Sequence, residues 1–284
     1  MKSLVLVDGN SLLFRAYYAT AYKKKKIQNE KGEDINALIV FINMFKKILE
    51  KTEKNICVIF DSREKTQKHI LYKNYKKKRL PTPIDLISQI VLIKKYLTLS
   101  GIKHYFKNGY EADDIIGTLA KKASNQNVSV FIFSSDKDFL QLIDNNIRIC
   151  LIKKGLKNVI YYDENILWNE FNLKPNQIID FKSIIGDASD NIKGIPQIGP
   201  KTAIKLLNKF QNLENIFNNL QEIDSKIKEK LIIFKDRVFF NRFLVKINIS
   251  VPICFEYTET YIQKINYFLL DVFLKKYRPK YNKI

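Results

Sequence analysis

Acidic side chains are scarce in this chain, yet they gather in five short motifs whose composition suits the binding of metal ions. The 284 residues include 49 Lys and Arg against 29 Asp and Glu, a formal net charge of +20. The motifs are VDGN, IFDS, GYEADD, SSDKD and IIGDASDN, and their acidic residues are Asp8, Asp61, Glu111, Asp113, Asp114, Asp136, Asp138, Asp187 and Asp190. Negative charge gathered on a basic chain indicates a cation site within a surface that binds a polyanion.

Each motif taken alone has an ordinary structural explanation. Acids favour the first turn of a helix, which accounts for GYEADD. Asp is common in turns, which accounts for SSDKD and GDASDN, and Asp8 and Asp61 are explained as caps at strand ends. All these explanations would have to hold together, however, and like charges that meet without cations repel one another. We therefore interpret the nine carboxylates as one metal-binding set.

The ligand types favour a hard cation. Carboxylate sites without His or Cys select Mg²⁺ or Mn²⁺, and two such ions about 4 Å apart can activate water and stabilise the leaving oxygen in phosphodiester hydrolysis. The two histidines, His69 and His104, lie outside the acidic motifs. We therefore predict neither a histidine general base nor a zinc site.

The segment GIPQIGPKTAIKLLNKF predicts a phosphate contact. Gly194 and Gly199 bracket a turn, Pro200 suits the first turn of a helix, and Lys201 and Thr202 follow. Backbone N–H groups at such a helix start can hold a phosphate without reading bases. An ordinary helix–turn–helix is the alternative. The spacing approaches that of a nucleotide-binding loop, but the lysine is displaced and no strand precedes it, so we reject that match.

The segment 65–83 is strongly basic and contains two tyrosines. If it is helical, one face carries Tyr72, Tyr75, Lys76 and Arg79. Tyrosines can stack on unpaired bases while Lys and Arg contact phosphates. A solvated basic loop is the alternative. The four lysines at 23–26 predict weaker contacts with a duplex backbone.

Hydrophobic patterning predicts an α/β fold with a central sheet covered by helices on both faces. We expect strands at 3–8, 55–60, 128–134 and 147–152, and helices at 34–51, 84–100, 111–124 and 200–210. From about residue 175 onward helices dominate. Asp8, Asp61 and the pair Asp136/Asp138 follow predicted strands, and the carboxyl ends of strands in open α/β sheets are where ligands bind.

The remaining composition indicates a soluble, cytoplasmic protein. Cys57, Cys150 and Cys254 lie far apart within apolar runs, which predicts buried free thiols in a reducing compartment. The first residues contain too short an apolar stretch for a signal peptide, and no apolar run is long enough to span a bilayer. We therefore expect no membrane partner.

Together these motifs resemble the 5′-nuclease (flap endonuclease) family, and most closely the 5′–3′ exonuclease domain of bacterial DNA polymerase I. The matching stretches, in the family's order, are VLVDGNSLLFRAYYA, YKNYKKKRLPTP, GYEADDIIGTLAKKA, SSDKDFLQLI and IIGDASDNIKGIPQIGPKTAIKLL. The resemblance implies a largely parallel sheet of the PIN-like 5′-nuclease fold in a catalytic domain at 1–174, with a helical arch at about 62–85. It implies a helical region at 175–284 with a helix–hairpin–helix DNA clamp at about 186–210.

The resemblance also implies the roles of particular residues. Two divalent ions would be held by the nine carboxylates, and Tyr75, Lys76 and Arg79 would orient the scissile phosphate from the arch. Contacts with DNA are implied for Arg15, Lys68, Tyr72, Gly194, Ile195, Gly199, Lys201 and Thr202, with a K⁺ ion at the 194–202 turn. One departure concerns the arch, where Gln67-Lys68 precede His69 in place of the usual Phe-Arg.

The leading hypothesis is a monomeric structure-selective nuclease that removes RNA primers or 5′ flaps from DNA during replication and repair, beside a separate DNA polymerase. Its substrates would be DNA with a 5′ flap, a nick or an RNA primer. A PIN-like RNase is one alternative, although that class usually lacks the arch and the 194–202 turn. A catalytically silent protein that binds DNA junctions is the other, but none of the nine carboxylates is missing.

Overall fold

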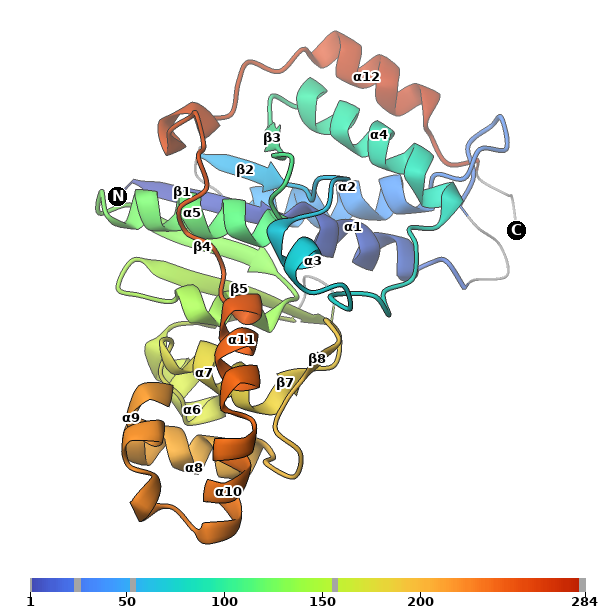
Figure 1. Ribbon diagram of the computed structural model, residues 1–284. Coiled ribbons are helices and arrows are strands. Elements are labelled where there is room, and N and C mark those ends of the chain that lie inside the picture. Colours follow the sequence, from blue (N-terminus) through green and yellow to red (C-terminus); the bar gives the residue numbers. More distant parts are fainter. Residues whose placement is uncertain (1, 23–26, 52–54, 155–157, 281–284) are drawn as a thin grey trace.

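A six-stranded sheet forms the centre of the computed structural model, which describes residues 2–22, 27–51, 55–154 and 158–280 (Figure 1). The strand order is β3-β2-β1-β4-β5-β6. The strands are β1 (Ser3–Asp8), β2 (Ile56–Ile59), β3 (Lys103–Tyr105), β4 (Ser129–Ser134), β5 (Ile147–Lys154) and β6 (Asn158–Tyr162). Only β6 runs antiparallel to its neighbour, so the predicted largely parallel α/β sheet is confirmed.

Helices cover both faces because alternate residues of the strands point to opposite sides. Val5 and Val7 pack on one face against α1 (Gly9–Tyr18), α2 (Asn36–Leu49) and α4 (Ile84–Leu99), whereas Leu4 and Leu6 pack on the other face against α5 (Ala112–Ser124). The central strand β1 is therefore buried on both sides, as parallel sheets require.

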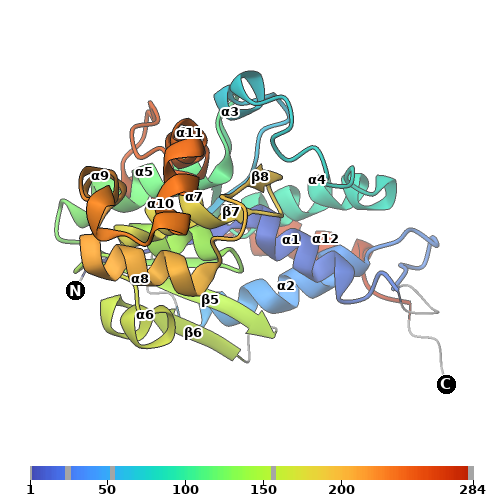
Figure 2. The same ribbon diagram turned by 60° about the horizontal axis from the view of Figure 1, so that its bottom comes forward.

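The second half of the chain is mainly helical and includes a short hairpin. Its elements are α6 (Glu164–Phe171), α7 (Gln177–Ile185), β7 (Gly186–Asp187), β8 (Ile192–Lys193), α8 (Pro200–Phe210), α9 (Leu213–Asn218), α10 (Ser225–Ile233), α11 (Lys235–Val245) and α12 (Tyr267–Lys276). Figures 1 and 2 show α7 to α11 grouped at one end of the molecule, away from α2 and α12. The chain returns after α11, so that α12 packs against α4.

The basic segment differs from the predicted helical arch. Only α3 (Gln67–Leu71) is helical, and residues 73–78 form successive turns. Lys76 has a left-handed backbone conformation, with φ of 55°, which a right-handed helix cannot contain. Tyr72, Tyr75, Lys76 and Arg79 consequently do not share one helical face.

Two further observations bear on the sequence predictions. Cys57 and Cys150 are buried free thiols, but Cys254 is exposed, so that prediction was wrong for Cys254. Its segment, which follows α11, crosses the surface without regular structure, which leaves the thiol uncovered. Within the described ranges, no helix combines the length and the apolar character needed to cross a membrane.

Candidate active site

A cavity of about 400 Å³ lies at the carboxyl edge of the sheet, and four of the predicted carboxylates line it. Its wall includes Asp8, Asp61, Asp113 and Asp136, together with Lys76, Arg79 and Ser189. The chain leaves β1 toward β2 and β3 and later returns to β4 on the other side of β1. Such a reversal in strand order opens a crevice at the carboxyl ends, which explains why Asp8 and Asp136 meet there.

Hydrogen bonds fix Asp8 at the end of β1. The Ser11 N–H donates to Asp8 Oδ1 over 2.9 Å, so that Asp8 also caps helix α1. The Ser134 hydroxyl donates to Asp8 Oδ2 over 2.7 Å and accepts from the Asp136 N–H over 3.0 Å. The next residue must be small, because a Cβ on Gly9 would lie 2.7 Å from the Ile59 carbonyl oxygen.

Asp61 connects the end of β2 to the start of α5. Its Oδ1 accepts from the Ala112 N–H over 2.8 Å, and its own N–H donates to Asn10 Oδ1 over 3.0 Å. The contact with Ala112 holds the first turn of α5, and Asp113 follows in that turn and lines the cavity. The structure therefore places the end of β2 and the start of α5 at the same cavity.

The carboxylates of this cavity repel one another, and Lys76 and Arg79 at its wall offset that repulsion only in part. Burial, together with the charges of Asp61 and Asp136, raises the pKa of Asp8 to about 7. Burial and the charges of Asp136 and Asp8 also raise the pKa of Asp113 well above its usual value. Divalent cations would relieve both the repulsion and the cost of burial. The all-oxygen donor set fits Mg²⁺ or Mn²⁺.

A second acidic group forms around Lys182, a residue of α7. Its ammonium contacts Asp138 and lies 2.6 Å from Asp187 Oδ2. Burial acts to raise the pKa of Asp187, but Lys182 and hydrogen bonds from Ser189 and the Asp190 N–H outweigh it and hold that pKa at about 2. Burial and the charge of Asp136 raise the pKa of Asp138 to about 7 despite Lys182.

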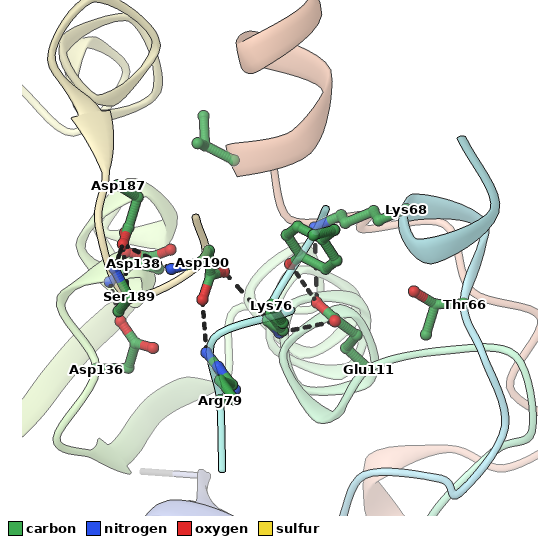
Figure 3. A network of polar contacts seen from close by, with 12 residues as sticks. Thr66, Lys68, Lys76, Arg79, Glu111, Asp136, Asp138, Asp187, Ser189 and Asp190 are labelled. Carbon is green, nitrogen blue, oxygen red and sulfur yellow. Dashed lines mark hydrogen bonds and ion pairs between the residues drawn. The ribbon is translucent and has the colours of Figure 1, made fainter. Parts of the chain in front are cut away.

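A third group joins residues 67–79, called the arch segment below, to Glu111 and Asp190 (Figure 3). Lys76 Nζ lies 2.7 Å from Glu111 Oε1 and 4.0 Å from Asp190 Oδ2, and Arg79 lies 2.7 Å from Asp190 Oδ1. Lys68 contacts the other oxygen of Glu111 over 3.8 Å. These ion pairs place the two arch cations, Lys76 and Arg79, at the wall of the acidic cavity.

Hydrogen bonds to main-chain groups connect the arch segment to the β7–β8 hairpin. The Lys76 N–H donates to the Asp190 carbonyl over 3.0 Å. The side-chain amide of Asn191 donates to the Asn74 carbonyl over 2.9 Å, and the main-chain carbonyl of Asn191 accepts from the Tyr72 hydroxyl over 3.2 Å. The positions of the arch cations and of Asp190 are therefore coupled.

Several predicted contacts lie elsewhere than expected. Tyr75 is only 4% exposed, packs with Leu244 and Val245, and donates its hydroxyl to Glu111, so it offers no face to a base. Arg15 donates to the Ile152 and Lys153 carbonyls. Asp114 accepts from the Asn248 N–H over 2.8 Å and lines a different cavity.

The 194–202 turn leads into α8, with Gly199 as the N-cap and Pro200 in the first turn. A Cβ on Gly194 would lie 2.3 Å from the Ile185 carbonyl oxygen, so this position requires glycine. Ile195 is buried and its N–H already donates to the Ile184 carbonyl, so it has no donor left for a phosphate. Gly199 and Lys201 are exposed and Thr202 is half-buried. The lysines at 23–26 lie outside the described residues.

Sequence reasoning missed Lys182, Ser134 and Asn10, which hold the predicted carboxylates in place. One feature of the sequence could have indicated Lys182, because it is the single charged residue in the segment FKSII. Among the described residues, no three acidic side chains converge closely enough to hold an ion as they stand. The Lys76 and Lys182 ammonium groups instead lie between them.

We expect Lys182→Met to lower the Tm of the metal-free protein and to enlarge the rise in Tm that Mg²⁺ produces. Without the ammonium group, Asp138 and Asp187 repel each other, which costs about 2–3 kcal/mol for a partly buried pair, and a cation then gains more by binding. Thermal unfolding with and without Mg²⁺ measures both effects. Lys174→Met, at an exposed lysine, is the control. An unchanged response to Mg²⁺ would show that these two carboxylates hold no ion.

Two family profiles together match nearly the whole chain. Residues 3–172 match the 5′-3′ exonuclease N-terminal resolvase-like domain, and residues 173–267 match the 5′-3′ exonuclease C-terminal SAM fold. The 5′-3′ exonuclease of Buchnera aphidicola is 36% identical over 98% of this chain and 93% of its own length. DNA polymerase I of Bacillus subtilis is 40% identical over 89% of this chain, which spans only 28% of that relative.

A solved structure shows the same fold at low sequence identity. The D15 flap endonuclease of bacteriophage T5, in a pseudo-enzyme-product complex with DNA and metal ions, superimposes with a TM-score of 0.70. The match covers 96% of this chain and 97% of that chain at 21% identity. The central sheet, the helices on both faces and the helical second half are therefore shared.

Proposed function

The chain belongs to the 5′-3′ exonuclease family, and we propose that it is a Mg²⁺- or Mn²⁺-dependent nuclease that cuts DNA at 5′ flaps, nicks and RNA primers. The observation that carries the proposal is the cavity at the sheet edge. Four carboxylates line it, the pKa values of Asp8 and Asp113 are raised there, and Lys76 and Arg79 lie at its wall.

The residues that would hold metal ions form two sets. Asp8, Asp61, Asp113 and Asp136 share the cavity wall, while Asp138, Asp187, Asp190 and Glu111 surround it and are held by Lys182, Arg79 and Lys76. Two divalent ions bound there would supply an activated water and stabilise the leaving oxygen. Asp114 faces another cavity and would act through the position of α5.

The protein's own side chains orient the phosphate. The Lys76 ammonium and the Arg79 guanidinium present donors to a phosphate at the cavity mouth, where negative charge develops during the reaction. The main-chain hydrogen bond from Lys76 to Asp190 and the ion pair of Arg79 with Asp190 keep these donors next to the carboxylates. Lys201, Thr202 and the start of α8 would hold the duplex backbone away from the cut, with a K⁺ ion in the same turn.

We expect cleavage of a labelled DNA carrying a 5′ flap when Mg²⁺ or Mn²⁺ is present, and no cleavage in EDTA. Cutting should show no sequence preference, because backbone contacts carry no base information. Gel analysis of flap, nicked and blunt substrates with identical duplex sequences measures the preference for structure. Vigorous cleavage in EDTA would exclude the metal-dependent mechanism.

The same experiment separates the alternatives. A silent junction-binding protein would retard the flap substrate in a gel and leave it uncut with Mg²⁺. A PIN-like RNase would cut single-stranded RNA in preference to flap DNA. Action on RNA primers in replication and repair, cooperation with a separate DNA polymerase, a monomeric state and a cytoplasmic location belong to the proposal and rest on the family relationship.

A further inference from the structure

A second cavity lies behind Glu111, on the side away from Asp190 and Asp138. It has a volume of about 280 Å³ and is bounded by α3, the start of α5, the end of α11 and residues 246–250. Lys68, Tyr110, Phe243 and Lys246 are among its lining residues. Figure 3 shows Lys68 beyond Glu111 when viewed from Asp190.

One carboxylate separates this cavity from the acidic one. Glu111 Oε1 contacts Lys76, which lines the acidic cavity, and Glu111 Oε2 lies 3.8 Å from Lys68, which lines the second cavity. A nucleic-acid strand advances roughly 3.4 Å per nucleotide in a duplex and further when extended. A strand positioned at the acidic cavity therefore reaches the second cavity within a few nucleotides.

The lining suits an unpaired base. Phe243 is 41% exposed at the cavity and stacks on Phe240, with ring centroids 6.5 Å apart, and Phe240 rests against Tyr72. An aromatic ring held in this way by its neighbours is a stacking platform for any base. Lys68 and the exposed Lys246 offer donors to the flanking phosphates.

The carboxylate of Asp114 determines which part of a nucleotide can enter this cavity. Asp114 lines the cavity, and its carboxylate would repel a phosphate there but can accept from the amino groups of a base. A duplex does not fit a cavity of this size. We propose that this cavity binds unpaired nucleotides continuing in the 5′ direction from the strand that is cut, with a base against Phe243 and phosphates at Lys68 and Lys246. This inference rests on the proposed nuclease function.

The test compares two substrates that share one duplex, a nick without a tail and a nick with a five-nucleotide 5′ tail. We expect Phe243→Ala to raise KM about tenfold for the tailed substrate and to leave the nicked substrate unchanged. Lys246→Ala should act in the same direction, while Phe243→Trp should restore the wild-type KM. Phe268→Ala, at an exposed phenylalanine of α12, is the matched control.

A binding measurement keeps this test separate from that of the nuclease function. A 2-aminopurine base in the tail should lose fluorescence when it stacks in the cavity of the wild-type protein in EDTA, and Phe243→Ala should abolish that loss. Equal effects of Phe243→Ala on tailed and nicked substrates, or unchanged fluorescence quenching in that variant, would overturn the proposal. If the wild-type protein cut neither substrate, the nuclease function would fail, whereas the quenching would still report on the cavity.

Discussion

Asp8→Asn is expected to lower the rate of DNA cleavage on the order of a thousandfold, equivalent to about 4 kcal/mol of transition-state stabilisation. Asparagine can keep the hydrogen bond from the Ser11 N–H that caps α1, because Asn and Asp cap helices about equally well. The variant therefore removes the charge and preserves the local structure. Rates measured with saturating DNA, over a range of Mg²⁺ concentrations, test this effect.

A matched control and a binding assay isolate the cause. Asp163 caps α6 in the same way, through the Ile166 N–H, and Asp163→Asn should leave the cleavage rate unchanged. DNA affinity in EDTA should survive in Asp8→Asn, since the basic surface still contacts phosphates. Near-normal cleavage by this variant would show that Asp8 does not bind a required ion.

The same substitution should stabilise the metal-free protein at high pH. The pKa of Asp8 is raised from 3.8 to about 7 in the folded state, so folding favours the protonated form. Its contribution to stability is present below about pH 4 and is lost as the pH rises toward 7. At pH 8 without metal, Asp8→Asn should therefore have a higher Tm than the wild type, and a smaller rise in Tm when Mg²⁺ is added. A lower Tm in EDTA would contradict this account.

The sequence was sufficient for the parts of the site that depend on local pattern. Each strand and helix that hydrophobic patterning predicted is present, because β-branched runs and helical periodicity are local features of the sequence. The positions of Asp8, Asp61 and Asp136 follow from one further rule, that the carboxyl ends of parallel strands lie at the same edge of the sheet. The five acidic motifs therefore indicated the cavity before any contact was known.

The errors concern contacts between segments far apart in the chain. Tyr75 is buried because α11 supplies Leu244 and Val245, about 170 residues later, and nothing near Tyr75 indicates that neighbour. Asp114 faces away from the acidic cavity because its carboxylate accepts a hydrogen bond from the Asn248 N–H at the second cavity. The turn at Lys76 likewise depends on a hydrogen bond to Asp190. Such pairings depend on tertiary packing, which local periodicity does not encode.

Lys76→Met is expected to slow the chemical step far more than it weakens DNA binding. Burial acts to lower the pKa of Lys76, but Glu111 and Asp190 outweigh it and raise that pKa above its usual value, so the side chain is charged throughout the working pH range. A fixed cation at the cavity wall stabilises charge that develops on the phosphate in the transition state, and the many other basic residues supply ground-state binding. Single-turnover rates should fall roughly a hundredfold or more, with a change in Kd of only a few fold.

Lys77→Met provides the matched control, because Lys77 is the next residue along the same turn and is exposed. Neutralising it should reduce affinity slightly on every substrate, reduce the salt dependence of binding and leave the saturated rate unchanged. Lys76→Met should also lower the Tm, because Glu111 loses its closest cation, so rates must be compared well below that temperature. If Lys76→Met raised Kd and left the saturated single-turnover rate intact, Lys76 would contribute to DNA binding in the ground state and would not take part in the chemical step.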